Sequence, residues 1–338
     1  MTDAGRLAGR FVGRNADRLP VRIYVLLALV VFSWGLNWPV LKIVLAEMPP
    51  LHFRVWCLGG GSIGLFTLAL LHGAPLRVPR GQWGRLIAIS AFSVLAWNIL
   101  IAYGVPLMDT GRASILAFTF PVWGVLAGRW IVGEPLTGRR VLGVAIGVGG
   151  AALLIGGDLA ALERAPAGPM MMIAAAMLWA VGTAIMKRWP VALPPVSFTA
   201  WQLGLSGLPV IVLAAFAPGS LSIASLSYPA QLGVLYNVAI GFIFCYWAWN
   251  QVAAAASVAV SSLSTLTVPV IGVFSSMLLL GERPQWTDYG GLALVVLALA
   301  IVLLPGRGSR HIAPAGVSEA APVVTPAAVP QAPPRRRT

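Results

Sequence analysis

Two stretches, SWGLNWPVLK at 33–42 and LWAVGTAIMK at 178–187, decide the fold of this chain, because they are two copies of one segment. In each stretch a tryptophan stands eight residues before the final lysine. The match continues at the same offset, since PPLHFRVW at 49–56 answers to PPVSFTAW at 194–201. Near the end of each copy the offset grows by three residues, as in the matching turns GEP at 133–135 and GER at 281–283. A series of matches in steady register indicates a duplicated chain, and in a membrane protein a duplication points to a transporter.

The composition is that of a membrane protein. Of 338 residues, 58% are hydrophobic and 10% are charged, and the mean hydropathy is +0.85. Soluble proteins carry about 25% charged residues, so an ordinary soluble domain is excluded. Apolar stretches near the roughly 20 residues that cross a bilayer recur along the chain. The sequence predicts ten spans, at 23–45, 51–72, 85–107, 112–131, 139–156, 168–187, 195–216, 231–251, 258–279 and 288–304.

The basic residues predict how these spans are oriented. If the N-terminus is cytoplasmic, all but five of the 23 lysines and arginines lie inside, the exceptions being Lys42, Arg54, Arg112, Arg164 and Arg283. An excess of Lys and Arg on the cytoplasmic side is the rule for membrane proteins. We therefore expect a multi-pass protein of the cell inner (plasma) membrane with both termini in the cytoplasm. The net charge of +13 then reflects topology, and no nucleic-acid partner is expected.

The duplication divides the chain into four predicted parts. Since each copy holds five spans, an odd number, the second copy enters the membrane from the opposite side, and the repeats are inverted. The expected parts are a basic cytoplasmic segment at 1–22, a first five-helix repeat at 23–160, a second, inverted repeat at 165–304 and a disordered cytoplasmic tail at 305–338. The tail is rich in Pro and Ala and cannot bury a core. The basic segment is either a disordered tail or a surface helix on anionic lipid.

Polar and aromatic side chains gather on three repeat-related pairs of spans, the first with the sixth, the third with the eighth and the fourth with the ninth. Polar groups in a bilayer usually face the bundle interior or a water-filled cavity. Aromatic faces accept apolar side chains and attract ammonium groups, while amide and hydroxyl groups can satisfy a carboxylate. The predicted substrate-binding residues are Trp34, Asn37, Trp38, Asn98, Tyr103, Thr119, Trp179, Thr183, Tyr246, Trp249, Asn250, Ser261 and Thr265. The alternative is structural, because Trp and Tyr also form interfacial belts and Ser and Thr join helices.

Two prolines occupy matching positions in the fourth and ninth spans. Pro121 and Pro269 each remove a backbone hydrogen bond and kink the helix. Paired interruptions of this kind mark transport sites, so we expect the two prolines to act as gating hinges; a static bend is the alternative.

Charged residues at the span ends have two interpretations as well. Lys42 and Lys187 either extend to the lipid headgroups or attract a substrate carboxylate at one mouth of a cavity. Glu134 and Glu282, in the repeated Gly-Glu turns, either cap or salt-bridge the next helix or take part in gating.

No motif indicates an enzyme. The sequence has no Gly-rich phosphate loop, zinc-protease motif or serine-hydrolase elbow, and its three histidines form no metal cluster. We expect no catalytic residues, no metal and no cofactor. Gly143 and Gly147 are expected to allow close helix contact within one chain, consistent with a monomer.

These motifs resemble the drug/metabolite transporter superfamily, in its ten-helix EamA-type permease branch. The resemblance covers about residues 23–304 and rests on five elements: WGLNW followed by Lys42, PPLHFRVW, FPVWGVLAGRWIVGEPLTGRRVLG, YWAWNQVA and VPVIGVFSSMLLLGERPQWTDYGG. It implies an all-α, basket-shaped carrier of ten transmembrane helices, built as two inverted five-helix repeats and working by alternating access. The tyrosines and tryptophans of the eighth span are similar to the branch that exports aromatic and other neutral amino acids.

We therefore expect an exporter of neutral amino acids, aromatic or large and apolar, whose partners are that small-molecule substrate and the lipid bilayer. One alternative within the superfamily is a drug or organic-cation exporter, which would favour a buried carboxylate. Another is an exchanger of phosphorylated metabolites or nucleotide sugars, which would favour paired basic groups deep in the cavity.

Overall fold

The computed structural model describes residues 20–156, 165–255 and 266–303, and all regular structure in these ranges is helical. Eight helices are long and apolar enough to cross a membrane, and two shorter apolar ones follow them, which confirms the predicted all-α membrane class. The ten spans begin and end within three residues of their predicted limits, except at the C-terminal end of the eighth and in the ninth, which adjoin residues outside the described ranges. The predictions for the two terminal segments also concern residues that lie outside these ranges, apart from 20–22.

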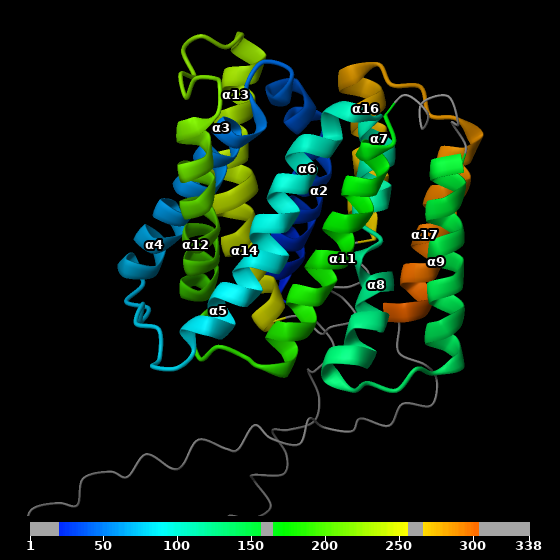
Figure 1. Ribbon diagram of the computed structural model, residues 1–338, viewed down its shortest axis with the longest axis horizontal. Helices are drawn as coiled ribbons and strands as arrows, with labels where there is room; N and C mark the ends of the chain where they lie inside the picture. Colours follow the sequence, from blue (N-terminus) through cyan, green and yellow to red (C-terminus); the bar gives the residue numbers. More distant parts are fainter. Residues whose placement is uncertain (1–19, 157–164, 256–265, 304–338) are drawn as a thin grey trace, which may run out of the picture. The chain divides into compact units, whose positions relative to one another are not determined.

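Helices are numbered along the chain (Figure 1). The first repeat holds α2 (Val21–Leu45); α3 (Pro50–Arg54), η1 (Val55–Gly60) and α4 (Gly61–Leu71); α5 (Trp83–Ile89), η2 (Ser90–Ala96), α6 (Trp97–Gly104) and η3 (Val105–Leu107); α7 (Thr110–Ala117), α8 (Phe120–Ala127) and η4 (Gly128–Val132); and α9 (Gly138–Gly156). The second repeat holds α11 (Ala167–Arg188); α12 (Pro195–Phe216); α13 (Tyr228–Tyr236), η5 (Asn237–Phe244) and α14 (Cys245–Ala255); α16 (Thr267–Leu280); and α17 (Trp286–Leu303).

Four spans contain a stretch of π-helix, in which each backbone hydrogen bond joins residues five apart instead of the four of an α-helix. These stretches are η1, η2, η4 and η5. Two of them, η2 in the third span and η5 in the eighth, lie in equivalent spans of the two repeats. Such insertions occur frequently at functional sites, and they rotate the side chains that follow them.

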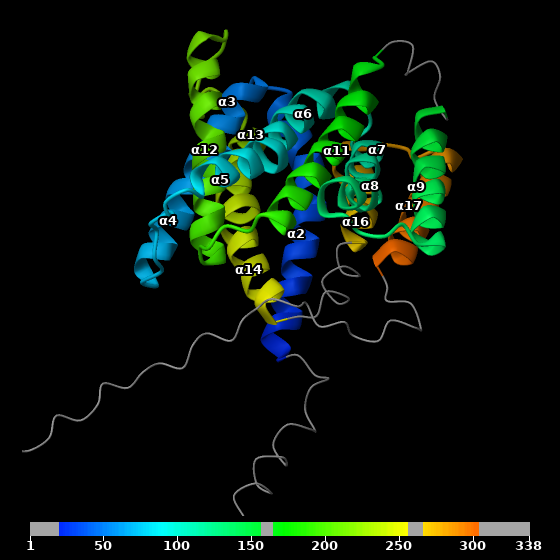
Figure 2. The same cartoon turned by 60° about the horizontal axis from the view of Figure 1, so that its bottom comes forward.

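The first helix of each repeat packs against the other repeat. The helix α2 contacts α13, α14 and α16, in the eighth and ninth spans, and α11 contacts α6, η2, α7 and α8, in the third and fourth. The remaining large contacts pair α4 with α12, α7 with α16, and α9 with α17, each between equivalent spans. The helices α2 and α11 run in opposite directions (Figure 2). This pattern is the one expected when a two-fold axis relates two inverted repeats.

Glycines set the close approach of the fifth and tenth spans. A Cβ added to Gly143 of α9 would lie 2.6 Å from Val302 of α17, and one added to Gly147 would lie 2.5 Å from Val122 of α8. Side chains at these positions would collide with their neighbours, so the small residues allow helix contact within the chain, as the sequence predicted.

Candidate functional site

The tryptophan of the first repeated stretch packs against the eighth span. The ring of Trp34, on α2, lies 6.0 Å from Tyr246 and 5.6 Å from Trp249, measured between ring centroids. Its indole N–H donates to the carbonyl of Gly241 at 3.4 Å. Three predicted binding residues, Trp34, Tyr246 and Trp249, therefore form one group, which we call the Trp34 cluster.

The repeat-related tryptophan packs in the same manner against the third span. Trp179, on α11, lies 4.9 Å from Trp97 and 6.1 Å from Phe120 between centroids. Phe120 lies 5.9 Å from Phe118, which in turn lies 6.4 Å from Trp38 on α2. This Trp179 cluster thus links the first helices of the two repeats through the fourth span. The sequence signal for Phe118 and Phe120 was available in FTFP, where the two aromatics flank Thr119, just before Pro121.

The fourth span is broken just before Pro121. The helix α7 ends at Ala117 and α8 begins at Phe120, so Pro121 stands in the first turn of α8, where its missing N–H leaves no gap in the bonding. The hydroxyl of Thr119, at the break, donates to Leu116 O at 2.6 Å and accepts from the indole N–H of Trp123 at 3.0 Å. Pro269 stands similarly, in the first turn of α16. A hinge role for the two prolines stays a prediction.

The three predicted asparagines differ in their hydrogen bonding. Asn98 is buried, and its amide nitrogen donates to Val94 O at 2.9 Å, one turn earlier in its own span. By contrast, Oδ1 of Asn37 and Nδ2 of Asn250 are buried and have no hydrogen-bond partner among the described residues. A fourth asparagine, Asn237, was missed; it is fully buried and its Oδ1 is unpartnered in the same sense. Buried polar atoms without a partner need an explanation, and a ligand is one.

Two of the remaining predicted residues, Tyr103 and Thr183, are exposed. Tyr103 is 40% exposed, and the exposed Thr183 donates to the carbonyl of Trp179 at 2.8 Å. Ser261 and Thr265 lie outside the described residues.

Ion pairs join the repeats at both ends of the bundle. Lys42, at the end of α2, lies 3.2 Å from Glu282 in the turn between the ninth and tenth spans. Lys187, at the end of α11, pairs with Glu134 in the turn between the fourth and fifth. These four residues are the repeat-related lysines and glutamates, and each lysine pairs with the glutamate of the other repeat. Both lysines are therefore engaged with protein carboxylates.

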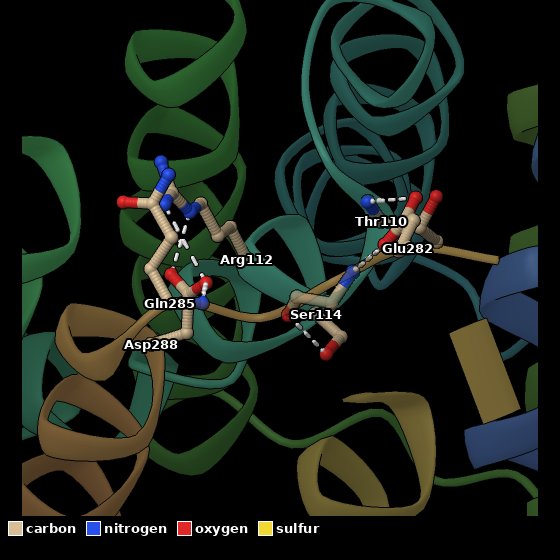
Figure 3. Close-up of polar contacts among 7 residues, drawn as sticks. Thr110, Arg112, Ser114, Glu282, Gln285 and Asp288 are labelled. Carbon is tan, nitrogen blue, oxygen red and sulfur yellow. Dashed lines mark hydrogen bonds and ion pairs between the residues drawn. The ribbon is translucent and has the colours of Figure 1, made fainter. Parts of the chain in front are cut away.

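Glu282 is the better-held of the two carboxylates. It accepts from the backbone N–H groups of Thr110 at 2.8 Å and Gly111 at 3.1 Å, at the start of α7 (Figure 3). Burial favours its neutral form, but these N–H groups and Lys42 prevail and lower its pKa. The pKa of Glu134 is also lowered, chiefly by its bond from Lys187. Burial and the nearby charge of Glu282 raise the pKa of Asp109.

A second ion pair beside Glu282 is buried. Arg112 Nε lies 2.5 Å from Asp288 Oδ1, and Nη2 lies 3.4 Å from Oδ2 (Figure 3). Both side chains are less than a tenth exposed. A cavity of about 330 Å³ opens at this end of the bundle, with Lys42, Asp109 and Arg112 in its wall. None of the predicted binding residues lines it. Among the described residues, no group of three His, Cys, Asp or Glu side chains is placed to hold a metal ion.

The model of one transporter family matches the chain twice, at residues 21–156 and 166–304, described as the EamA-like transporter family. The chain belongs to this family. The double match covers both copies of the duplication, so the family assignment and the repeat agree.

Relatives of this EamA-like transporter cover most of its length. It is 28% identical over 288 residues to a protein of Escherichia coli named "Probable amino-acid metabolite efflux pump", covering 82% of this chain and 93% of that one. It is 27% identical over 290 residues to the "Probable terminal-alkyne amino-acid exporter" of Streptantibioticus cattleyicolor, covering 84% and 94%. An uncharacterised transporter of Bacillus subtilis is 27% identical over 310 residues, covering 89% and 97%.

A crystal structure of a protein that is 20% identical supports the fold of this EamA-like transporter. It matches with a TM-score of 0.56 and covers 82% of this chain and 96% of that one. The family, the ten helices and the repeat together define a multi-pass membrane transporter of a small-molecule substrate.

Proposed function

We propose that this transporter exports neutral amino acids with aromatic or large apolar side chains, by alternating access across the inner membrane, with both termini in the cytoplasm. The observation that carries the proposal is the pair of aromatic clusters. Trp34 and Trp179 occupy equivalent positions in the two repeats, and each packs against aromatic residues of the other repeat. Aromatic faces of this kind suit a large apolar side chain.

The relatives favour an amino acid as the substrate. Two of them are named for amino-acid efflux or export, and each is aligned over more than nine-tenths of its own length. Acidic residues argue against an organic cation, since those in the described ranges, Glu47, Asp109, Glu134, Glu282 and Asp288, all lie in turns or in the first turn of a helix. None of them is placed among the aromatic rings, where a cation would need a counter-charge.

The packing also favours particular moving bodies. Since α2 packs against the eighth and ninth spans and α11 against the third and fourth, each body would contain helices of both repeats. The break before Pro121 lies within the fourth span, where α7 contacts α16 of the other body and both α7 and α8 contact α11. Bending there would change access from one side to the other.

The test is transport by the purified protein in liposomes. Vesicles loaded with labelled phenylalanine, leucine or glutamate are compared for exchange, and Trp34→Ala and Trp179→Ala are expected to lose most of the phenylalanine exchange. Trp130→Ala is the matched control, because Trp130 is 80% exposed and lies outside both clusters. If organic cations or phosphorylated metabolites are exchanged and no amino acid is, the proposal is wrong.

A further inference from the structure

An arginine lies buried in the second span without an acidic partner. Arg54, on α3, is 3% exposed, and its Nε–H donates to the backbone carbonyl of Asn98 at 3.0 Å. Its guanidinium carbon lies 5.2 Å from the centroid of the adjacent Phe53 ring. The sequence had grouped Arg54 with the outside basic residues, and the structure instead buries it between the second and third spans.

The acidic residues in the described ranges are engaged elsewhere. Glu282 and Glu134 hold the two lysines, Asp288 holds Arg112, Glu47 accepts from Ser227, and Asp109 lies beside Glu282. The titratable groups that act on Arg54 are Cys57 and Tyr246, which are neutral in their ordinary state at pH 7. A buried guanidinium therefore has no counter-ion among the described residues, and an ionisable group in that position within a span indicates a functional site.

Two unpartnered oxygen atoms lie at the neighbouring junction of α2 and η5. A Cβ built on Gly241 would lie 3.7 Å from Asn37 Oδ1 and 3.9 Å from Asn237 Oδ1, so both oxygens face the same side of Gly241. The amide nitrogen of Asn237 donates to Gly233 O at 3.0 Å, which fixes which way its side chain is turned. Both oxygens are buried and lack a donor among the described residues. Amide oxygens accept hydrogen bonds and give none, so they call for a ligand that donates.

The Trp34 cluster connects the arginine to these oxygens. The Trp34 indole N–H donates to Gly241 O, and its ring meets the ring of Tyr246. The helix α2, which carries Trp34, contacts α3, which carries Arg54. The π-helix η5 contacts both η1, which follows Arg54, and α2, which carries Asn37. Among the described residues, the guanidinium of Arg54, which has no counter-ion, and the amide oxygens of Asn37 and Asn237, which have no donor, thus lie on helices that contact the helices of the Trp34 cluster.

We propose that this region binds the head group of a zwitterionic amino acid. Arg54 receives the carboxylate, the amide oxygens of Asn37 and Asn237 accept from the ammonium group, and the substrate side chain lies against Trp34 and Tyr246. A guanidinium matches a carboxylate with two parallel hydrogen bonds, and an ammonium group carries three donors for amide oxygens. This inference rests on the proposed function and specifies how its substrate is recognised.

The repeat supports a single orientation of the substrate. Arg54 corresponds to Thr199 in the second repeat, and Asn37 corresponds to Gly182. The guanidinium of Arg54 and the amide of Asn37 therefore have no charged or amide counterpart in the second copy, while the tryptophans are present in both. Because the tryptophans are repeated and the groups for the carboxylate and ammonium are not, such a site would hold an amino acid in a single orientation.

The experiment compares three ligands that differ only in the head group: phenylalanine, phenylalaninamide, which lacks the carboxylate charge, and 3-phenylpropionate, which lacks the ammonium. The wild type in liposomes is expected to prefer phenylalanine over either analogue by about tenfold or more in kcat/KM. In Arg54→Gln the preference over phenylalaninamide falls to about threefold or less, mainly through KM, and Arg54→Lys retains part of it. Asn37→Leu and Asn237→Leu lower the preference over 3-phenylpropionate and leave the preference over the amide. Arg129→Gln, at an exposed arginine, changes neither.

Thermal stabilisation of the wild type gives a second measurement that needs no variant. Phenylalanine should raise the unfolding temperature more than either analogue at equal concentration. Equal stabilisation by all three, or an unchanged preference in both Arg54 variants, overturns the head-group assignment while amino-acid transport stands. If the wild type neither transports nor is stabilised by any amino acid, the proposed function itself fails, and this inference fails with it.

Discussion

Removing the charge of Glu282 should lower the free energy of unfolding more than removing the charge of Glu134, the equivalent residue of the other repeat. Glu282 accepts two backbone N–H groups at the start of α7 and lies 3.2 Å from Lys42, and its side chain is 11% exposed. Glu134 meets Lys187 and Arg140, whose side chains are 63% and 35% exposed. The two substitutions, Glu282→Gln and Glu134→Gln, are chemically identical, so the difference between them measures the surroundings.

The magnitudes follow from the bonds. A glutamine at 282 keeps one acceptor oxygen and turns an N–H pair toward the second backbone donor, which leaves that donor unsatisfied at a cost of about 1–3 kcal/mol. Loss of a negative charge at a helix N-terminus adds about 0.3–1 kcal/mol. The expected cost of Glu282→Gln is therefore about 1.3–4 kcal/mol. Exposed ion pairs contribute about 0–1 kcal/mol after solvent screening, and Glu134→Gln should stay within that range.

Thermal unfolding of the purified protein in detergent measures both variants. With about 2 °C per kcal/mol for a chain of this size, the unfolding temperature should fall by about 3–8 °C for Glu282→Gln and by about 2 °C or less for Glu134→Gln. Adding Lys42→Met to Glu282→Gln should cost less than the sum of the two single changes, because the lysine has already lost its partner. Equal shifts for the two glutamate variants would refute the reasoning.

Three further predictions concern packing, pH and the buried ion pair. Gly182→Ala should lower both stability and transport, because its Cβ would lie 2.7 Å from a backbone nitrogen of η2, whereas Gly149→Ala, with nothing within 4 Å, should leave the unfolding temperature unchanged or raise it. The pKa of Glu282 is lowered from 4.5, so its stabilisation is present above that pH and is lost as the pH falls through the lower folded value; the difference in unfolding temperature between wild type and Glu282→Gln should be constant from pH 7 to 5 and shrink only below about pH 4.5. Arg112→Leu should cost about 3–5 kcal/mol by leaving a buried carboxylate, and combining it with Asp288→Leu should recover most of the loss in the same unfolding assay; an additive loss would contradict this account.

The spans and the pairing of the repeats could be predicted from the sequence because they depend on hydropathy and on local matches. Trp34 and Trp179 were identified through the repeat, and each lies in an aromatic cluster. The repeat also contained enough information to predict the two ion pairs. Lys42 and Glu282 are 240 residues apart, but Lys187 and Glu134 are their counterparts, and a two-fold axis that forms one pair also forms the other.

The polar end of the candidate site could not be predicted in the same way. Asn237 begins a π-helix, and the insertion of one residue shifts the face on which later side chains lie, so a 3.6-residue period assigns them wrongly. Arg54 is the fifth residue of its span, where a long basic side chain ordinarily reaches the headgroups. Its burial depends on how closely the second and third spans pack, which is a property of the tertiary structure.

The ion pairs change what the duplication means for transport. Each joins the first helix of one repeat to the turn after the fourth span of the other, at opposite ends of the bundle. The largest packing contact of α2 is with α16, the helix before Glu282, and α11 packs against α8, in the span before Glu134, as well as against α6. Neither repeat is therefore a rigid unit by itself, and a rocking motion of one repeat against the other would break both ion pairs and both interfaces. We expect that motion of two mixed bodies would keep both ion pairs, at the cost of the bonds from the backbone of Thr110 and Gly111 to Glu282.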